Sequence, residues 1–363
     1  MKWIWQLPGW RDFPYKTELF EEYEQKFLDL AGQALGALKH IEKDGQTQLR
    51  VELLRNEALQ TSEIEGELLD KDSLQSSIQK QFGLKVTKEN RSLKEQGVSE
   101  MLMKVYRSYD EPLSHDFIRS LHHHLFHQQR SDAGEYRTDE APMQVVSGSI
   151  DRPIVHYEAP PSAQVEEELE ALISWYNEAH SSRMPSLVLA AITHLWFETI
   201  HPFEDGNGRV GRALAEKSLS QSLGRPALIS LSSTIQKKKS AYYDAFTYAQ
   251  SGIEVEATSW MGYFQPLAIE AQQMSLQTIE FLIQKSRFLQ KYQPIINERQ
   301  NKVLLRMLAE GVDGFTGGLS AGNYASVTQA PSTTTTRDLN DLVKKGALTK
   351  TGERKHTRYW LNL

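Results

Sequence analysis

Apolar residues recur at three- and four-residue spacing through residues 16–110, as in the stretch "LFEEYEQKFLDLAGQALGAL", without Val/Ile/Thr-rich alternation. This spacing predicts mostly amphipathic helices. The pattern changes in residues 135–161. Two short β-prone runs, Met143–Ser147 and Ile154–Glu158, are separated by polar turn residues with Gly148 and Pro153, and they predict a β-hairpin.

Helical periodicity returns after the hairpin and continues for most of the chain. It predicts a helix from Gln164, one that follows Pro185 with Ser186 as its N-cap, one over 209–223 that stops before Gly224 and Pro226, and two more over roughly 232–251 and 256–288.

A different segment begins at Pro294. Three short helices (297–311, 320–329 and 332–348) and an alternating pair of strands at the end of the chain are typical of a winged helix, with Thr333–Lys345 as recognition helix and Thr351–Tyr359 as wing. Residues 293–363 hold ten Lys/Arg against six Asp/Glu. Arg337, Arg354, Lys355 and Arg358 could therefore contact phosphates of DNA; protein binding, or packing on the rest of the chain, is the alternative.

Composition narrows the class of protein. The chain has 363 residues, enough for two or three domains, a net charge of −6 and no cysteine. The charge argues against a chain coated in nucleic acid, and the missing cysteines exclude disulfides and thiolate–metal sites. We find no signal peptide in the first residues and no apolar run of the roughly 20 residues that a membrane helix needs, so we expect a cytoplasmic protein without membrane association.

The stretch "HPFEDGNGRVGR" at 201–212 contains a complete G-x-G-x-x-G. A dinucleotide fold would need a preceding strand, but a predicted helix precedes this loop. A P-loop would need Lys and Ser/Thr where Arg212 and Ala213 stand. His194, Glu198 and His201 share a helical flank without the H-E-x-x-H of a zinc site, and the "HHH" at 122–124 is expected to be a partly solvated surface.

The loop combines groups that suit transfer of a phosphate-linked group. Backbone N–H groups of Gly206, Asn207 and Gly208 at a helix N-terminus can bind an anion. Arg209 and Arg212 can hold phosphate oxygens, Asp205 can ligate a magnesium ion, and His201 can act as a base.

The stretch resembles the Fic signature H-P-F-x-[DE]-G-N-G-R-x-x-R at every fixed position. The resemblance implies a mainly α-helical Fic core that transfers AMP from Mg-ATP to Ser, Thr or Tyr hydroxyls of target proteins. It makes His201 the base and Asp205 the Mg²⁺ ligand. It places the α- and β-phosphates at Gly206, Asn207 and Gly208 with help from Arg209, and the γ-phosphate at Arg212.

Two further segments resemble the family. "GEYR" at 134–137 and the hairpin are similar to its flap, which implies that Val155, His156 and Tyr157 lie near the target and the nucleotide. Residues 237–252 are similar to its adenosine-binding helix, with Tyr242 and Gln250 as contacts, although Gln250 stands where Asn is more usual. Core packing is an equal alternative for Tyr243.

The motif "TSEIEGE" at 61–67 is similar to the family's inhibitory motif [ST]-x-x-x-E-[GN], through Thr61, Glu65 and Gly66. By this resemblance Glu65 pairs with Arg212 and competes with the γ-phosphate. The alternative is a solvated glutamate.

The expected organisation is an N-terminal helical region over 1–110 with the inhibitory helix, a Fic core over 111–290 and a winged-helix-like domain over 293–363. Removal of AMP from proteins, and a nucleotide-sensing DNA-binding regulator, remain alternative functions. The sequence does not decide between a monomer and a homodimer.

Overall fold

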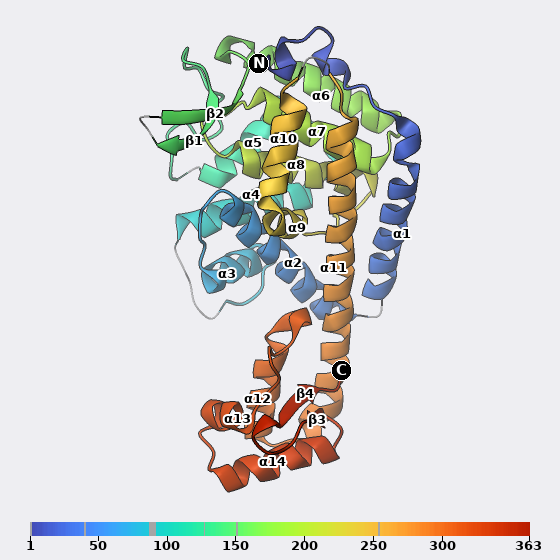
Figure 1. Cartoon of the computed structure of the whole chain (residues 1–363), viewed down its shortest axis with the longest axis vertical. Coiled ribbons are helices and arrows are strands. Elements are labelled where there is room, and N and C mark those ends of the chain that lie inside the picture. Colours follow the sequence, from blue (N-terminus) through green and yellow to red (C-terminus); the bar gives the residue numbers. More distant parts are fainter. Residues whose placement is uncertain (1, 40, 87–91, 127, 150–151, 253–254) are drawn as a thin grey trace. The chain divides into compact units, whose positions relative to one another are not determined.

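The computed structural model describes all residues except 1, 40, 87–91, 127, 150–151 and 253–254 (Figure 1). It is mainly helical, as predicted. The chain forms two compact units: Met1–Leu35 with Lys43–Ser275, and Gly36–Glu42 with Leu276–Leu363.

The described residues of the first unit form α1 to α10 and one hairpin, and α1 and α11 each extend into residues of the second unit. The bounds are α1 Glu21–Leu38, α2 Lys43–Ile64, α3 Lys71–Gln81, α4 Leu93–Arg107, α5 His115–Phe126, β1 Gln144–Ser149, β2 Arg152–Glu158, α6 Val165–Ser181, α7 Ser186–Ile200, α8 Asn207–Ser222, α9 Leu231–Lys237, α10 Lys239–Gln250 and α11 Thr258–Tyr292. Short 3-10 helices cover Ile4–Gln6, Trp10–Asp12, Thr17–Leu19 and Ser162–Gln164.

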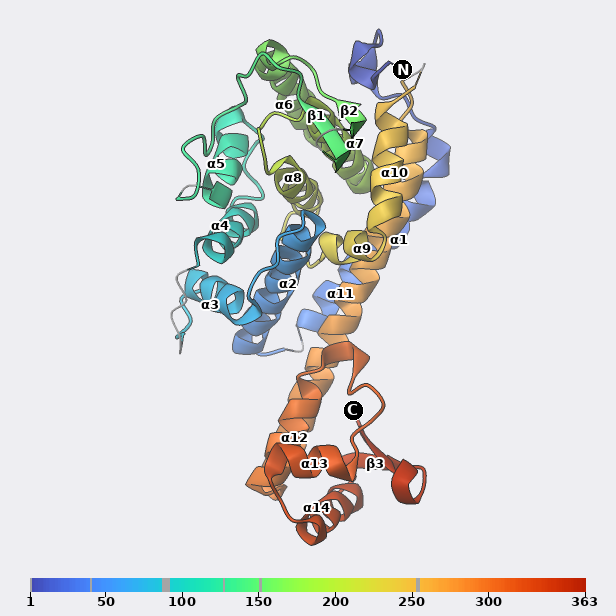
Figure 2. The same ribbon diagram turned by 60° about the vertical axis from the view of Figure 1, so that its left-hand side comes forward.

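The centre of this unit is the pair α7 and α8, which lie side by side in both ribbon views (Figures 1 and 2). Every residue of α7 is buried except the partly buried Glu198. A helix that is apolar around its whole circumference belongs in a core, because each face must be covered by another element.

The N-terminus of α7 corrects one expectation. Ser186 was predicted to be its N-cap, but Pro185 occupies that position and Ser186 is the first helical residue. The carboxylate of Glu24, on α1, accepts hydrogen bonds from the backbone N–H groups of Ser186 (2.8 Å) and Leu187 (2.9 Å). A side chain distant in sequence therefore satisfies the first N–H groups of the helix.

The helix predicted over 232–251 is two helices, α9 and α10, which are interrupted at Lys238. Helix α9 packs on α2, whereas α10 packs on α7 and β2. The two parts therefore follow different neighbours, which local periodicity does not reveal.

The second unit contains the end of α11 and the expected three helices and strand pair. These are α12 Glu298–Leu308, α13 Ala321–Thr328, α14 Ser332–Lys344, β3 Leu348–Thr351 and β4 Arg358–Leu361, with short 3-10 turns over Gln293–Ile295, Gly311–Asp313 and Arg354–His356. Strands β3 and β4 are antiparallel, with Leu348 opposite Leu361. Val303, Tyr324, Leu339 and other buried side chains form a hydrophobic core of its own.

Candidate functional site

The loop between α7 and α8 has two residues in the left-handed region of backbone space. His201 caps the C-terminus of α7 with φ 50°, and Gly206 caps the N-terminus of α8 with φ 80°. A non-glycine residue with positive φ is uncommon, and such residues cluster at functional sites. The loop thus puts an imidazole at one end and the N-terminus of a helix at the other.

Side chains around Phe203 hold this loop in shape. Asn207 accepts a hydrogen bond from Phe203 N (2.9 Å) and donates one to Phe203 O (2.7 Å). His122 stacks on the Phe203 ring with 3.9 Å between centroids, and its Nδ1 accepts from Gly134 N at 2.8 Å. The "HHH" at 122–124 was predicted to be a partly solvated surface. This prediction was wrong for His122, which is buried because it packs between the loop and Gly134 of "GEYR".

Arg137, the last residue of "GEYR", is a supporting residue that sequence reasoning did not identify. It is buried, and its guanidinium donates to the carbonyls of His201 (2.8 Å), Ile200 (3.3 Å) and Pro160. These bonds satisfy the C-terminal carbonyls of α7, where a cation is also favoured by the helix dipole. The Arg of the "GEYR" pattern was the available signal.

A cavity of about 570 Å³ opens above the loop. Most of the predicted site residues line it, namely Glu65, His156, Tyr157, His201, Asp205, Gly206, Asn207, Gly208, Arg212, Tyr242 and Gln250. Within the described part of the chain, Val155, Arg209, Thr61 and Gly66 are not lining residues. Glu198 and Tyr243 also line the cavity. Its size is that of a small-molecule site.

His201 is a base in its neutral form. Burial lowers its pKa to about 4, although a backbone hydrogen bond with Glu198 opposes this. Its Nδ1 lies 3.8 Å from the Glu198 carboxylate. With Nδ1 turned toward Glu198, Nε2 is the nitrogen available to take a proton.

Glu198 is a partly buried acid, 12% exposed at its side chain, that favours the neutral form. Burial raises its pKa to about 8, and its Oε1 has no hydrogen-bond partner among the described residues. A Cβ added to Gly211 would overlap Glu198 Oε1 and approach His194 Nδ1 to 3.0 Å. This close approach gives the third glycine of the motif a packing role.

Arg212 is 1% exposed and is held by the segment Thr61–Glu65. Its Nε donates to Thr61 Oγ1 (2.8 Å), and one terminal nitrogen donates to Thr61 O (2.9 Å) and to Glu65 Oε1 (2.7 Å). Burial lowers the pKa of Arg212, but the Glu65 carboxylate more than offsets this and the pKa is raised. Glu65 also lies against Gly208, because a Cβ there would overlap its Oε1. Its carboxylate thus occupies the N-terminus of α8, where an anion would bind.

The backbone conformation at Gly66 explains why the motif has a glycine at this position. It has φ 81° just after α2. Gly66 N donates to Glu63 O (3.0 Å), and Glu67 N donates to Ser62 O (2.9 Å). This is a Schellman end, which needs a left-handed residue such as Gly or Asn, and it directs Glu65 toward the loop.

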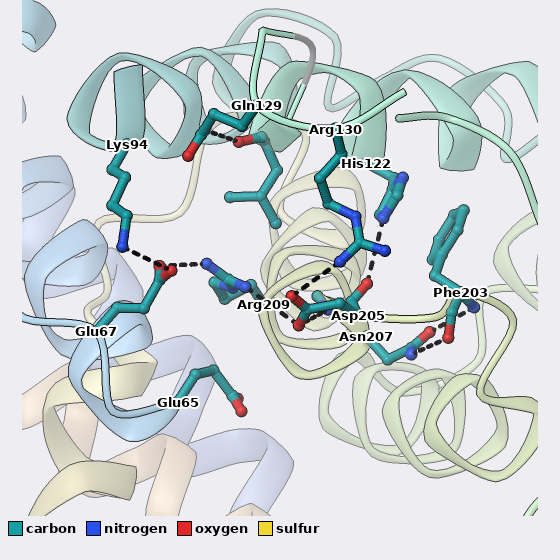
Figure 3. A network of polar contacts seen from close by, with 12 residues as sticks. Glu65, Glu67, Lys94, His122, Gln129, Arg130, Phe203, Asp205, Asn207 and Arg209 are labelled. Atoms are coloured by element: carbon teal, nitrogen blue, oxygen red, sulfur yellow. Dashed lines mark hydrogen bonds and ion pairs between the residues drawn. The ribbon is translucent and has the colours of Figure 1, made fainter. Parts of the chain in front are cut away.

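Arg209 takes part in a network of ion pairs instead of lining the cavity (Figure 3). It is buried and pairs with Glu67 at 2.5 Å and with Asp205 at 3.5 Å. Arg130 also pairs with Asp205 (3.4 Å), and Lys94 with Glu67 (3.5 Å). Glu67 therefore connects the segment 61–67 to the loop at 201–212 at a second point.

Of the predicted contacts on the hairpin and α10, Val155 alone does not line the cavity. Strand β2 has a bulge, because Val145 pairs with Tyr157 and Val146 pairs with Val155. His156 is therefore the extra residue, and a bulge often changes the direction in which such a side chain points. Tyr157 is buried, and its hydroxyl donates to Thr199 O (2.6 Å).

Tyr242 and Gln250 are both buried. The Tyr242 hydroxyl lies 2.7 Å from His194 Nε2, and Gln250 Nε2 is 3.5 Å from Thr199 Oγ1. Tyr243, at 39% exposure, is not a core residue.

Asp205 fits a magnesium ion that also binds phosphates. Its side chain is 52% exposed and faces the cavity. The described residues contain no group of three or more His, Cys, Asp or Glu that could hold a metal by themselves. Mg²⁺ commonly takes one or two carboxylates and completes its shell with water and substrate phosphates. This donor set therefore suits Mg²⁺ and not a structural zinc ion.

An imidazole, a helix N-terminus and a buried arginine thus surround one cavity on a helical scaffold, an arrangement that fits a phosphate group. Residues 112–219 match the Fic/DOC family, and residues 3–84 match a domain of unknown function, DUF4172. The chain thus carries a Fic/DOC domain over residues 112–219.

Solved structures share the fold. The chain is 19% identical to a Fic family protein from Desulfovibrio desulfuricans G20, with a TM-score of 0.52 over 93% of this chain and 95% of that one. A Fic domain containing signaling protein from Bacteroides thetaiotaomicron gives 0.55 at 19% identity, over 70% of this chain and 98% of that one.

Among curated proteins, 78 residues are 36% identical to the protein adenylyltransferase Fic of Drosophila ananassae, over 22% of this chain and 15% of that protein. The match to the protein adenylyltransferase fic-1 of Caenorhabditis briggsae is 29% over 86 residues, or 24% of this chain and 16% of that protein. The chain thus matches less than a fifth of the length of these relatives. Among the described helices, none is both long and apolar enough to cross a membrane.

Proposed function

We propose that this protein transfers AMP from ATP to a hydroxyl group of a protein. The observation that carries the proposal is the pairing of a neutral, partly buried imidazole, His201, with the N-terminus of α8 across one cavity. Relatives named protein adenylyltransferase support it.

The side chain and backbone groups of this loop have different roles in the reaction. Nε2 of His201 takes the proton of the acceptor Ser, Thr or Tyr hydroxyl as its oxygen attacks the α-phosphorus. The new O–P bond forms while the bond from the α-phosphorus to the bridging oxygen breaks, and pyrophosphate leaves. Backbone N–H groups at Asn207 and Gly208 stabilise the phosphate charge, whereas Gly206 N donates to Asp205 Oδ1 (2.6 Å).

Other side chains bind and orient the substrates. Arg212 binds the γ-phosphate once Glu65 has left it, and Asp205 holds Mg²⁺, which neutralises phosphate charge when bound. Tyr242 and Gln250 border the space for the adenosine. The exposed strands β1 and β2 offer an edge for an extended segment of the target protein. Arg209 acts indirectly, because it is buried behind the loop and orients Asp205.

We infer that the resting protein is inhibited by two acids of one segment. Glu65 neutralises Arg212, and Glu67 anchors the same turn through Arg209. Both arginines are almost completely buried, so their charges have little access to water and each depends on a carboxylate or a phosphate partner.

The test incubates the pure chain and its His201→Ala variant with Mg²⁺ and labelled ATP, CTP or UTP, and follows label on protein by mass spectrometry. We expect incorporation of AMP by the wild type and none by the variant, which should still bind Mg-ATP. Equal label on both proteins would overturn the role of His201. Loss of AMP from a pre-modified protein, without incorporation, would instead favour the reverse reaction.

A further inference from the structure

Helices α13 and α14 form a helix-turn-helix in the second unit. Three residues, 329–331, separate them, with Gln329 in the left-handed region (φ 57°) and Pro331 at the N-cap of α14. Strands β3 and β4 follow directly, and a backbone bridge between Leu319 and Tyr359 adds a third strand position. In a winged helix-turn-helix, the second helix of the turn enters the DNA major groove.

The outward face of α14 has a consistent chemistry. Its exposed or partly exposed residues include Thr333, Thr336, Arg337, Asn340 and Lys344. They follow the three- and four-residue spacing of one helix face, and the opposite face is buried through Thr335, Asp338, Leu339 and Leu342.

The two acidic residues of α14 do not repel an anion bound at this face, because both carboxylates already have partners. Asp338 is buried and accepts from Arg299 (2.9 Å) and the Tyr324 hydroxyl (3.0 Å). Asp341 pairs with Lys345 (2.5 Å) and accepts from Gln300 (2.8 Å). The face thus presents two cations with hydroxyl and amide groups, within a segment that is basic although the chain as a whole is acidic.

We propose that this face of α14 binds the major groove of double-stranded DNA. Arg337 and Lys344 supply the cations for phosphates or guanine, and Thr333, Thr336 and Asn340 supply hydrogen bonds to base edges. The exposed Arg354, in the turn between β3 and β4, contacts the backbone beside it. Recognition of single-stranded RNA relies on aromatic side chains for stacking, and α14, which is described throughout, contains none. The side chain of Lys355 lies outside the described part.

The test measures binding of the full chain to a fluorescent 30-base-pair duplex pool of random sequence, by anisotropy at about 50 and 200 mM KCl. We expect binding that weakens with salt. The double variant Arg337→Ala/Lys344→Ala should bind at least about tenfold more weakly at the lower salt, with a salt slope reduced by about 1–2. The matched control Lys302→Ala/Arg306→Ala removes the same charge from α12 and should bind within about twofold of wild type.

Sequencing of the bound pool tests base readout separately. Enriched sequences that are lost in Thr336→Ala/Asn340→Ala would support direct contacts to bases. These positions are exposed, so the melting temperature should not change. Equal binding by wild type and the Arg337/Lys344 variant, tighter binding to single-stranded RNA, or no binding to the duplex would overturn the proposal. AMP transfer is measured in parallel and is expected to be unaffected, so the two proposals fail independently.

Discussion

Replacing Glu65 by glycine tests the inhibitory contact. Arg212 makes three hydrogen bonds to the segment 61–65, and two of these go to Thr61, which stays in place. The substitution therefore removes one charge-assisted bond of 2.7 Å and leaves the guanidinium oriented but without an anion. We expect AMP transfer to rise because the γ-phosphate no longer competes with a carboxylate.

The magnitude follows from the burial of the pair. A hydrogen bond to a charged group contributes about 1.5–3 kcal/mol, or about 10–150-fold in an equilibrium. The Arg212 side chain is 1% exposed but that of Glu65 is 28% exposed, so solvent screening favours the lower end. We therefore expect a gain of about tenfold.

The assay is incorporation of labelled AMP into the protein itself at saturating Mg-ATP. The matched control is Glu63→Gly, which makes the same change two residues earlier in α2, where Glu63 accepts from Gln60 (3.3 Å). Arg212→Ala added to Glu65→Gly should lower the rate again. Equal rates for wild type and Glu65→Gly, or an equal gain in the Glu63 control, would refute the inhibitory role.

Four further predictions follow from the same geometry. Glu67→Gln should raise AMP transfer by several fold, less than Glu65→Gly, and an unchanged rate would show that the Glu67–Arg209 pair does not support inhibition. The transfer rate of Glu65→Gly should differ little between pH 8 and pH 6, because burial lowers the pKa of His201 to about 4; a base of ordinary pKa near 6.5 would lose about three-quarters of its neutral form at pH 6, and such a loss would contradict the burial. The pKa of Glu198 is raised to about 8, so the folded state binds this proton more tightly than the unfolded state does. The resulting stabilisation is full below about pH 4.5 and is lost as pH rises through 8. The melting temperature of wild type should therefore fall relative to that of Glu198→Gln between pH 5 and 8.5, and parallel curves for the two proteins would contradict the raised pKa. A chain that ends at Lys291 should keep AMP transfer to itself and lose DNA binding, and a folded but inactive truncation would show that the tail belongs to the catalytic unit.

The sequence alone predicted those parts of the structure that are formed by residues close together in the chain. The loop at 201–212 was predictable because one helix must end at His201-Pro202 and the next begin after Gly206. Helix α14 was predictable for the same reason. Three- and four-residue spacing determines which of its side chains share a face.

Contacts between distant residues were decided by the tertiary structure. Arg212 and Glu65 are 147 positions apart, and the Glu24 carboxylate that caps α7 is 162 positions from Ser186. His122 was expected on a partly solvated surface and Arg137 was given no role of its own, yet both are buried. A polar side chain can be buried when its hydrogen-bond partners are brought to it, and those partners, Gly134 for His122 and the α7 carbonyls for Arg137, are positioned by the packing of other helices. The sequence alone determined which groups carry charge and where each helix can begin and end, whereas the fold decided which of those charges meet, because an ion pair requires proximity in space and not in the chain.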